Sequence, residues 1–176
     1  MEVEVDILSW EEVDRLSRML AAKITNKPDV IVAVMRGGAV VSSILANELE
    51  VDAVASIKVI QGCQIPGTPE KGTMLVPLNK YNFKGKDVLI VDDILDSGES
   101  LLIVRDALEQ YCPKSIKIAV LQKKSYSKFD PDYYVEVRTN WIFYPWMSRK
   151  ELMEMRLKIA TSTATIKPVK TEKEAP

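Results

Sequence analysis

The sequence contains no histidine among its 176 residues. Histidine is the commonest general base in enzymes and the commonest metal-binding side chain. Any catalysis by this chain must therefore use carboxylates, lysines, backbone amides or a metal ion held by oxygen atoms. The two cysteines, Cys63 and Cys112, are too few for a disulfide framework, and we expect a reducing, cytoplasmic environment.

Long apolar runs and a strong charge of one sign are also missing. No stretch approaches the roughly 18 consecutive apolar residues of a membrane span, so no membrane partner is expected. The chain opens with MEVEVDILSW, which is acidic where a secretory signal would be basic. The formal net charge of −1 argues against a nucleic-acid partner, since such partners favour a basic surface.

Two kinds of segment alternate along the chain. Expected strands lie at 30–34, 54–60, 88–91 and 115–121. Expected helices lie at 10–25, 39–49, 99–111 and 148–160. Capping boxes are expected at the start of the first, from Ser9 and Glu12, and of the last, from Ser148 and Glu151. The runs at 30–34 and 88–91 are continuously apolar, as in strands buried on both faces of a sheet. Strands that alternate with amphipathic helices predict an α/β fold, with a central, mostly parallel sheet flanked by helices.

We expect one domain over residues 1–160. Within it, residues 61–84 form a long polar segment with several Gly and Pro residues. Loops of this length in compact domains are usually lids or disordered. Residues 125–150 are rich in aromatic side chains, and residues 161–176 are polar and rich in Lys and Thr, which predicts a flexible tail.

The strongest functional signal is VLIVDDILDSGESL, residues 88–101. Residues 96–100 stand between a predicted strand and a predicted helix. Such a turn can direct backbone N–H groups and a helix N-terminus at one phosphate. The hydroxyls of Ser97 and Ser100 add donors, so a phosphomonoester fits this turn.

Asp92 and Asp93 directly precede that turn. Adjacent carboxylates at a strand end are costly unless a cation or ligand hydroxyl groups offset them, and a sugar with a partly hydrated Mg²⁺ would do so. An acidic turn with a helix cap is the simpler alternative. The complete succession of four apolar residues, two aspartates and Asp-Ser-Gly-x-Ser is much more specific, and it favours a sugar-phosphate site.

A second loop, Arg36-Gly37-Gly38, follows the first buried strand. Arg36 supplies a permanent charge and a fork of donors suited to phosphate oxygens. Gly37 and Gly38 permit a tight turn and a close approach to a ligand. A solvated Gly-Gly turn would explain this loop if it stood alone. Because ligands bind at the carboxyl ends of parallel strands, both loops are expected at one edge of the sheet, as one site.

The segment VLIVDDILDSGES resembles the signature of the type I phosphoribosyltransferase family, which binds phosphoribosyl pyrophosphate (PRPP). The resemblance covers roughly residues 30–150 and is closest to the bacterial and archaeal branch that acts on hypoxanthine, xanthine or guanine, the 6-oxopurines. It implies a Mg²⁺-dependent enzyme that joins PRPP and a purine base into a nucleoside 5′-monophosphate and releases pyrophosphate. It also implies a homodimer or higher homo-oligomer.

The resemblance further implies individual roles. Asp92 and Asp93 would meet the ribose hydroxyls, directly or through Mg²⁺. The 5′-phosphate would be held by Asp96, Ser97, Gly98, Glu99 and Ser100. Asp96 would also approach the purine N7 as general base or acid. Arg36 and Gly37 would belong to the pyrophosphate loop, in which the peptide bond before the position of Arg36 is often cis.

The base pocket is expected near two further segments. Lysine donates hydrogen bonds and accepts none, so it suits a 6-oxo group and disfavours a 6-amino group. Lys123, with Lys124 as the alternative, resembles the family's base-recognising lysine, although both could be solvated loop lysines. In TNWIFYPWM, residues 139–147, Trp141 resembles the tryptophan that covers the purine. Ile142 would offer backbone groups to the base edge, and residues 125–150 would form a small hood.

One departure from the family concerns the lid, which the resemblance places at 61–84. Many hypoxanthine-guanine enzymes carry Ser-Tyr near the start of this lid, whereas residues 59–63 here read VIQGC. Three interpretations remain open. The acceptor is a 6-oxopurine; or it is adenine or a pyrimidine; or the chain is a regulator that keeps the PRPP fold, senses nucleotides and binds RNA.

Overall fold

The computed structural model describes residues 5–59, 78, 81–148, 150 and 153. The chain divides into two compact units. One, the terminal unit, combines Met1–Val13 with Arg138–Pro176; the other, the sheet unit, is Asp14–Val137. None of the helices within the described ranges is long and apolar enough to span a membrane.

The sheet unit is built on a five-stranded sheet with the order β3-β2-β4-β5-β6. Its strands are β2 (Val30–Val34), β3 (Val54–Ile57), β4 (Asp87–Leu95), β5 (Ser115–Lys124) and β6 (Tyr133–Arg138). The pairs β2–β3, β2–β4 and β4–β5 are parallel. Ile118 contacts Asp132, and four residues later in both segments Gln122 contacts Glu136. Because the contacts move forward along both segments, β6 runs parallel to β5.

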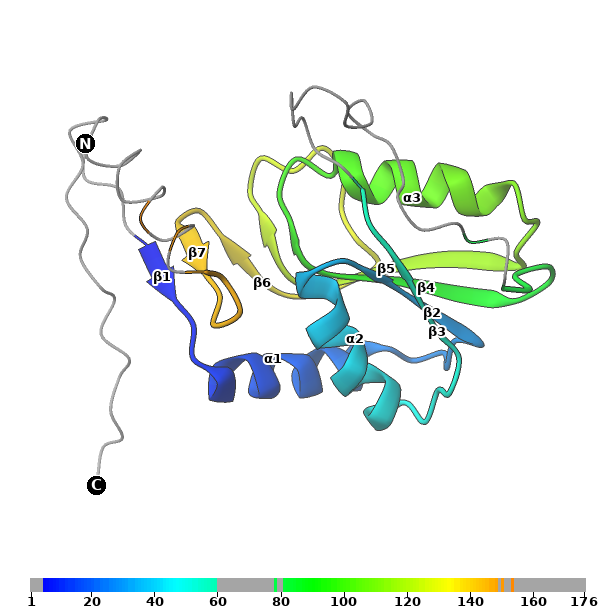
Figure 1. The fold of residues 1–176 in the computed structure, drawn as a ribbon, viewed down its shortest axis with the longest axis horizontal. Helices are drawn as coiled ribbons and strands as arrows, with labels where there is room; N and C mark the ends of the chain where they lie inside the picture. The colour runs from blue at the N-terminus through cyan, green and yellow to red at the C-terminus, as the bar shows by residue number, and fades with distance from the viewer. Residues whose placement is uncertain (1–4, 60–77, 79–80, 149, 151–152, 154–176) are drawn as a thin grey trace. The chain divides into compact units, whose positions relative to one another are not determined.

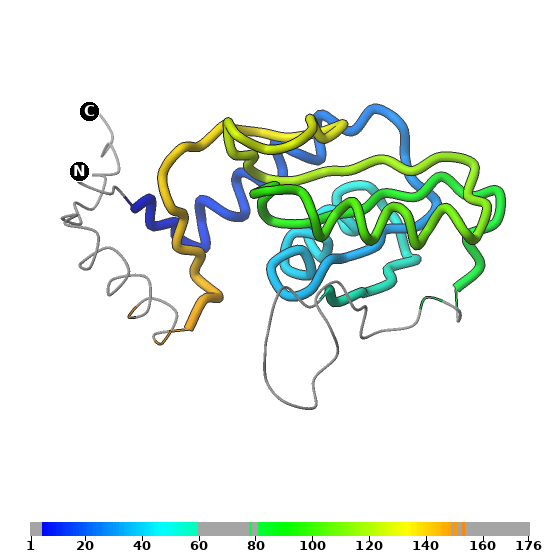
Figure 2. Tube along the Cα trace, turned by 90° about the horizontal axis from the view of Figure 1, so that it is seen from above, coloured from blue at the N-terminus to red at the C-terminus, as the bar shows by residue number. Residues whose placement is uncertain are grey.

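Helices cover both faces of this sheet (Figure 1). They are α1 (Trp10–Lys23), α2 (Gly37–Glu48) and α3 (Glu99–Glu109). Figure 1 shows α3 on one face and α1 and α2 on the other, and Figure 2 shows α3 running along the strands. Leu101, Val104 and Leu108 of α3 join one buried cluster with Val32 and Ile90. Because β2 is covered on both sides, all five of its residues are buried, as its continuous apolar run predicts.

Local sequence signals explain how α1 begins. The backbone N–H of Glu12 donates to Ser9 Oγ at 3.1 Å, and the backbone N–H of Ser9 donates to Glu12 Oε2 at 2.8 Å. This reciprocal pair is the capping box. A similar box expected at the start of a helix over 148–160 lies outside the described residues.

The end of β4 differs from the sequence expectation. The strand expected at 88–91 continues to Leu95, and it stays paired with β5 up to the Leu95–Lys123 pair. β2 has its expected range and ends before β4 does, so the last pair between β2 and β4 joins Ala33 with Val91. Asp92 and Asp93 therefore lie within a strand that is paired on one side, rather than in a loop.

The terminal unit contains β1 (Val5–Ile7) and β7 (Trp141–Phe143), which form a parallel two-stranded sheet. Asp6 is buried, and its carboxylate accepts hydrogen bonds from Arg138 at 3.2 Å and Asn140 at 3.1 Å. Such partners offset the cost of burying a charge. The rings of Tyr144 and Trp146 stack with centroids 4.6 Å apart.

Most of the predicted lid and the whole predicted tail at 161–176 lie outside the described residues. Leu78 and Phe83, near the end of the predicted lid segment, are buried in the core of the sheet unit. Phe83 contacts the ring of Tyr111 edge-on, with centroids 5.7 Å apart. Burial anchors this end of the segment to the sheet unit.

Candidate active site

The strand order creates a switch point between β2 and β4. The chain leaves β2 through α2 to reach β3 on one side, and then returns to add β4 on the other side of β2. In open α/β sheets, ligands bind outside the carboxyl ends of the strands at such a point. The loops after β2 and at the end of β4 flank it. These are the two loops that the sequence predicts to form one site.

Gly37 and Gly38 allow the first turn of α2 to pack directly on the end of β4. A Cβ atom added to Gly37 would overlap the carboxylate of Asp93, and one added to Gly38 would overlap the carbonyl oxygen of Val91. It would also lie 3.0 Å from the Cα atom of Asp92. Glycine is required here by space, because both residues have ordinary helical backbones and neither shows a positive φ.

Asp92 and Asp93 are half-buried at this junction. Each carboxylate accepts a hydrogen bond from the backbone N–H of the next residue. Asp93 N–H donates to Asp92 Oδ1 at 2.9 Å, and Ile94 N–H donates to Asp93 Oδ1 at 2.9 Å. Burial raises the pKa of Asp92 well above its usual value, and the neighbouring charge of Asp93 raises this pKa further. Two carboxylates in such a place favour a cation or donor-rich ligand beside them.

Residues 96–100 form the turn that the sequence assigns to a phosphate. Gly98 precedes α3 with a φ of 87°, a left-handed conformation that favours glycine. A Cβ atom there would also come within 2.7 Å of the Phe129 ring. Ser97 Oγ accepts a long hydrogen bond, 3.4 Å, from the backbone N–H of Glu99. The turn thus places the N-terminus of α3 beside the carboxyl end of β4, an arrangement suited to binding an anion.

Arg36 lies between β2 and α2, with an exposed side chain. The Met35–Arg36 peptide bond is cis, as the resemblance to the family's pyrophosphate loop implies. Arg36 directly precedes α2, and Gly37, the first residue of α2, packs against Asp93 of β4. Their role toward a pyrophosphate remains a prediction.

Asp96 has a partner that sequence reasoning missed. The hydroxyl of Tyr126 donates to Asp96 Oδ1 at 2.5 Å. This hydrogen bond raises the pKa of Tyr126 to about 12, with smaller effects from burial and from the charge of Asp96. The two residues are 30 positions apart, and no motif in the sequence indicates their contact.

The two candidate lysines differ in their surroundings. Lys123 Nζ is ion-paired with Asp130 and lies 4.7 Å from the centroid of the Tyr134 ring. The hydrogen bond that Lys123 donates to Asp130 is the main cause that raises the pKa of Lys123. Lys124, the last residue of β5, is buried at 6% exposure. The last pair between β4 and β5 joins Leu95 with Lys123.

Trp141 and Ile142 belong to the terminal unit, whereas the other candidate residues belong to the sheet unit. The Trp141 side chain is 53% exposed, as a stacking surface requires, and Ile142 is buried. In β1–β7, Trp141 pairs with Val5 and Ile142 with Asp6.

Oxygen donors are the relevant ligands for a metal ion. Among the described residues, no three His, Cys, Asp or Glu side chains gather as a preformed metal cage. Mg²⁺ needs no such cage, because it is commonly held by one or two carboxylates, waters and the phosphates of a substrate. The half-buried pair Asp92 and Asp93 fits that donor set.

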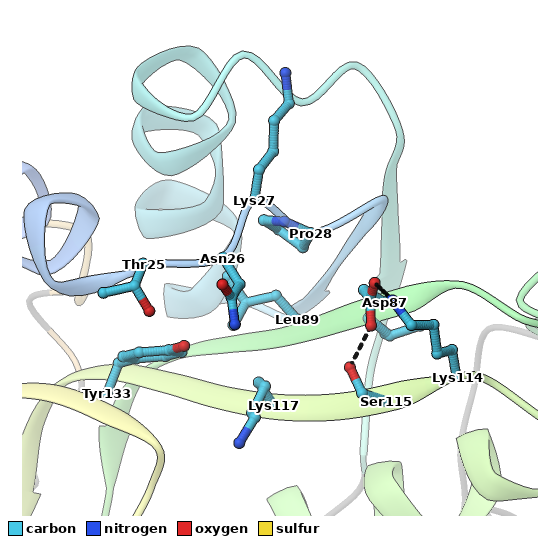
Figure 3. Close-up of a pocket in the computed structure, with 11 residues that line it drawn as sticks. Thr25, Asn26, Lys27, Pro28, Asp87, Leu89, Lys114, Ser115, Lys117 and Tyr133 are labelled. Carbon is cyan, nitrogen blue, oxygen red and sulfur yellow. Dashed lines mark hydrogen bonds and ion pairs between the residues drawn. The ribbon is translucent and has the colours of Figure 1, made fainter.

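A separate hollow of ≈ 440 Å³ lies at the opposite, amino-terminal edge of the strands (Figure 3). Three of its charged side chains, Asp87, Lys114 and Lys117, take part in ion pairs. Asp87 accepts from Lys114 at 2.6 Å and from Ser115 at 2.7 Å, and Lys117 pairs with Asp132 at 2.7 Å. The bond from Lys114 is the first cause that lowers the pKa of Asp87. This hollow lies away from the switch point and is not the candidate active site.

Comparison with known proteins agrees with this geometry. Residues 6–148 match the family model described as "Phosphoribosyl transferase domain". The chain belongs to the phosphoribosyltransferase family. Among curated proteins of the family, the xanthine-guanine phosphoribosyltransferase of Gluconobacter oxydans is 32% identical over 143 residues, which cover 79% of this chain and 82% of the relative.

Solved structures show the same family relationship. A purine phosphoribosyltransferase from Pyrococcus horikoshii superposes with a TM-score of 0.74 and 36% identity, and covers 82% of this chain and 94% of that one. The xanthine-guanine-hypoxanthine phosphoribosyltransferase of Helicobacter pylori superposes with a TM-score of 0.70 and 25% identity, over 86% and 99% of the two chains. The predicted fold, a parallel sheet flanked by helices, is confirmed.

Proposed function

We propose that this chain is a Mg²⁺-dependent phosphoribosyltransferase of purine salvage. It would form a nucleoside 5′-monophosphate and pyrophosphate from PRPP and a 6-oxopurine base, in the cytoplasm and as a homodimer or higher homo-oligomer. The observation that carries this proposal is the junction of Gly37 and Gly38 with Asp92 and Asp93 beside the turn at 96–100. Family relatives named for xanthine, guanine and hypoxanthine support the choice of base.

The residues at the switch point suit the charges that develop in this reaction. As the bond between ribose C1′ and the pyrophosphate oxygen breaks, positive charge builds on the ribose and negative charge on pyrophosphate. Arg36 and the backbone N–H groups at the start of α2 would stabilise the leaving group. Asp92 and Asp93 would bind the ribose side and favour the developing cation. When bound, Mg²⁺ would supply further neutralisation of the phosphate oxygens.

Asp96 is the proposed general base. Purine N9 forms the new bond to C1′, and the proton on N7 passes to the Asp96 carboxylate, so that the product base is neutral. A group in this role must lie within hydrogen-bond reach of the proton that it takes. Asp96 is exposed as the first residue of the turn, directly after β4, where it can meet a base attached to the bound sugar.

Lysine would select the 6-oxo group. Sequence reasoning favours Lys123, whose ammonium group pairs with Asp130 and lies over the Tyr134 ring. Lys124 is buried as the last residue of β5, the neighbour of the strand that leads into Asp96. We therefore favour Lys124 as the donor to the exocyclic oxygen. Trp141 would stack on the purine, and the backbone of Ile142 would contact the base edge.

A steady-state assay tests this function. Purified protein is supplied with PRPP and MgCl₂ and with hypoxanthine, guanine, xanthine or adenine, and pyrophosphate release is measured. We expect turnover with at least one 6-oxopurine and a much lower kcat/KM for adenine. Loss of activity when EDTA replaces MgCl₂ is expected as well. Preference for adenine, or no turnover with any base, would contradict the proposal.

A further inference from the structure

The segment that follows β5 crosses the carboxyl end of β4. Ser127 Oγ lies 2.8 Å from the carbonyl oxygen of Leu95 and 2.7 Å from that of Asp96, so its hydroxyl proton is shared between two backbone acceptors. Tyr126, one residue earlier, donates its hydroxyl proton to Asp96 Oδ1. The same short segment thus contacts both the backbone and the side chain of Asp96.

The next two residues contact the phosphate turn itself. Lys128 Nζ lies 3.1 Å from Glu99 Oε1. The ring of Phe129 lies where a side chain on residue 98 would be, so Gly98 and Phe129 are packed without intervening space. Residues 126–129 therefore each contact a residue between 95 and 99. We call residues 126–129 the brace. The sequence predicts that they belong to the hood but assigns no role to any one of them.

We propose that Tyr126 is a positioning residue for Asp96, and that its hydroxyl holds the Asp96 carboxylate in the orientation that takes the purine proton. This inference rests on the proposed function. A carboxylate has two acceptor oxygens. Tyr126 binds Oδ1, and the proton from the purine passes to Oδ2.

Physical features of the contact favour such a role. Asp96 is exposed and would otherwise sample several rotamers, and ordering a side chain has an entropic cost. Ser127 fixes the backbone next to Tyr126, so Tyr126 can hold the Asp96 side chain in one rotamer. Much of the entropy loss of ordering Asp96 therefore occurs on folding, before substrate binds. The Tyr126 hydroxyl remains protonated at neutral pH because its pKa is raised, so it donates throughout the working range.

The test is the variant Tyr126→Phe, which removes the hydroxyl and keeps the ring. The single-turnover rate with PRPP, MgCl₂ and the preferred 6-oxopurine is measured with enzyme in excess, so that slow product release does not conceal the chemical step. We expect this rate to fall about tenfold, the effect of losing a hydrogen bond to a charged group. The Kd for PRPP should stay within about twofold, because Tyr126 acts on the base side.

Two control variants separate positioning from a structural effect. Tyr111→Phe removes a hydroxyl at the far end of α3, where the ring packs on Phe83, and should leave rate and affinity unchanged. Ser127→Ala loosens the brace on the backbone of the turn, and should weaken PRPP binding as well as the rate. Tyr126→Phe should resemble neither control.

The possible results lead to distinct conclusions. An active wild-type enzyme with a Tyr126→Phe rate within twofold of wild type would overturn this inference and leave the proposed function standing. The inference would also be overturned if Tyr126→Phe weakened PRPP binding by the same factor as it lowered the rate, since a residue with a purely structural role would behave in this way. A wild-type protein inactive with every base would overturn the proposed function, and this inference with it.

Discussion

Gly37 at the start of α2 lies so close to Asp93 of β4 that any side chain at position 37 would overlap the Asp93 carboxylate. This contact joins the start of α2 to the carboxyl end of β4. It also means that the loop after β2 and the acidic pair Asp92 and Asp93 cannot change independently. The requirement for glycine comes from the neighbouring strand, because the Gly37 backbone is helical.

Gly37→Ala is therefore expected to separate the two loops. The added methyl group must displace Asp93 or the first turn of α2, at a cost of about 1–3 kcal/mol in unfolding free energy. Binding of PRPP with Mg²⁺ should be lost or weakened more than tenfold, as measured by calorimetry. Gly85→Ala is the matched control: Gly85 has a φ of 69° and open space around it. It should cost about 1 kcal/mol of stability without an effect on PRPP.

Asp92→Asn should stabilise the ligand-free protein at neutral pH. The folded-state pKa of Asp92 is raised, chiefly by burial. The ionised Asp92 carboxylate therefore lowers the stability of the fold. This loss of stability is absent below the unfolded-state pKa of about 4 and grows as pH rises toward the folded-state pKa. Urea unfolding at pH 7.5 without Mg²⁺ should show a higher free energy of unfolding for the variant than for wild type, and this gain should shrink toward pH 4. Binding of PRPP with Mg²⁺ should be lost.

Asp87→Asn should change the free energy of unfolding in the opposite direction. The folded-state pKa of Asp87 is lowered, first by its bond from Lys114 and then by Ser115. Asp87 therefore contributes stability above its unfolded pKa, and this contribution is lost as pH falls through the folded pKa. The variant should be less stable than wild type at pH 7.5. If Asp92→Asn lost stability as Asp87→Asn does, burial of the Asp92 charge would not be destabilising and the prediction for Asp92 would be wrong.

Asp96→Asn should reduce turnover far more than PRPP affinity. A positioned general base contributes about 10²- to 10⁴-fold, so we expect kcat to fall by at least about 100-fold, while the Kd for PRPP changes little. Ser97→Ala should show the reverse, with weaker PRPP binding and a smaller loss of kcat. Near-normal turnover in Asp96→Asn would remove this residue from its catalytic role.

Lys123→Ala and Lys124→Ala distinguish the two lysines. The pair of Lys123 with Asp130 involves a partner that is 77% exposed, and such pairs contribute about 0–1 kcal/mol. Lys123→Ala should therefore be nearly silent. Lys124→Ala should raise the KM for the 6-oxopurine about tenfold or more and leave that for PRPP unchanged. The reverse result would restore Lys123 as the base-recognising residue.

Several expectations from the sequence are confirmed because their causes are local or follow from burial. The apolar run at 30–34 becomes β2, buried on both faces. Ser9 and Glu12 cap α1 reciprocally. The helix expected at 39–49 begins earlier, at Gly37. The sequence did not predict this start because glycine is a poor helix former and adds nothing to the apolar periodicity. Packing against β4 overrides that preference.

The strands β1, β6 and β7 were not indicated by the sequence. The sequence by itself determined the helices α1, α2 and α3, the strands β2, β3, β4 and β5, and that two polar loops end neighbouring strands. These features depend on hydrophobic periodicity and backbone conformation, which neighbouring residues specify. Only the tertiary structure decided that Tyr126 meets Asp96, that Asp130 pairs with Lys123 and that Asp93 excludes a side chain from position 37. Those contacts join separate segments, and their geometry exists only once strand order and register are set.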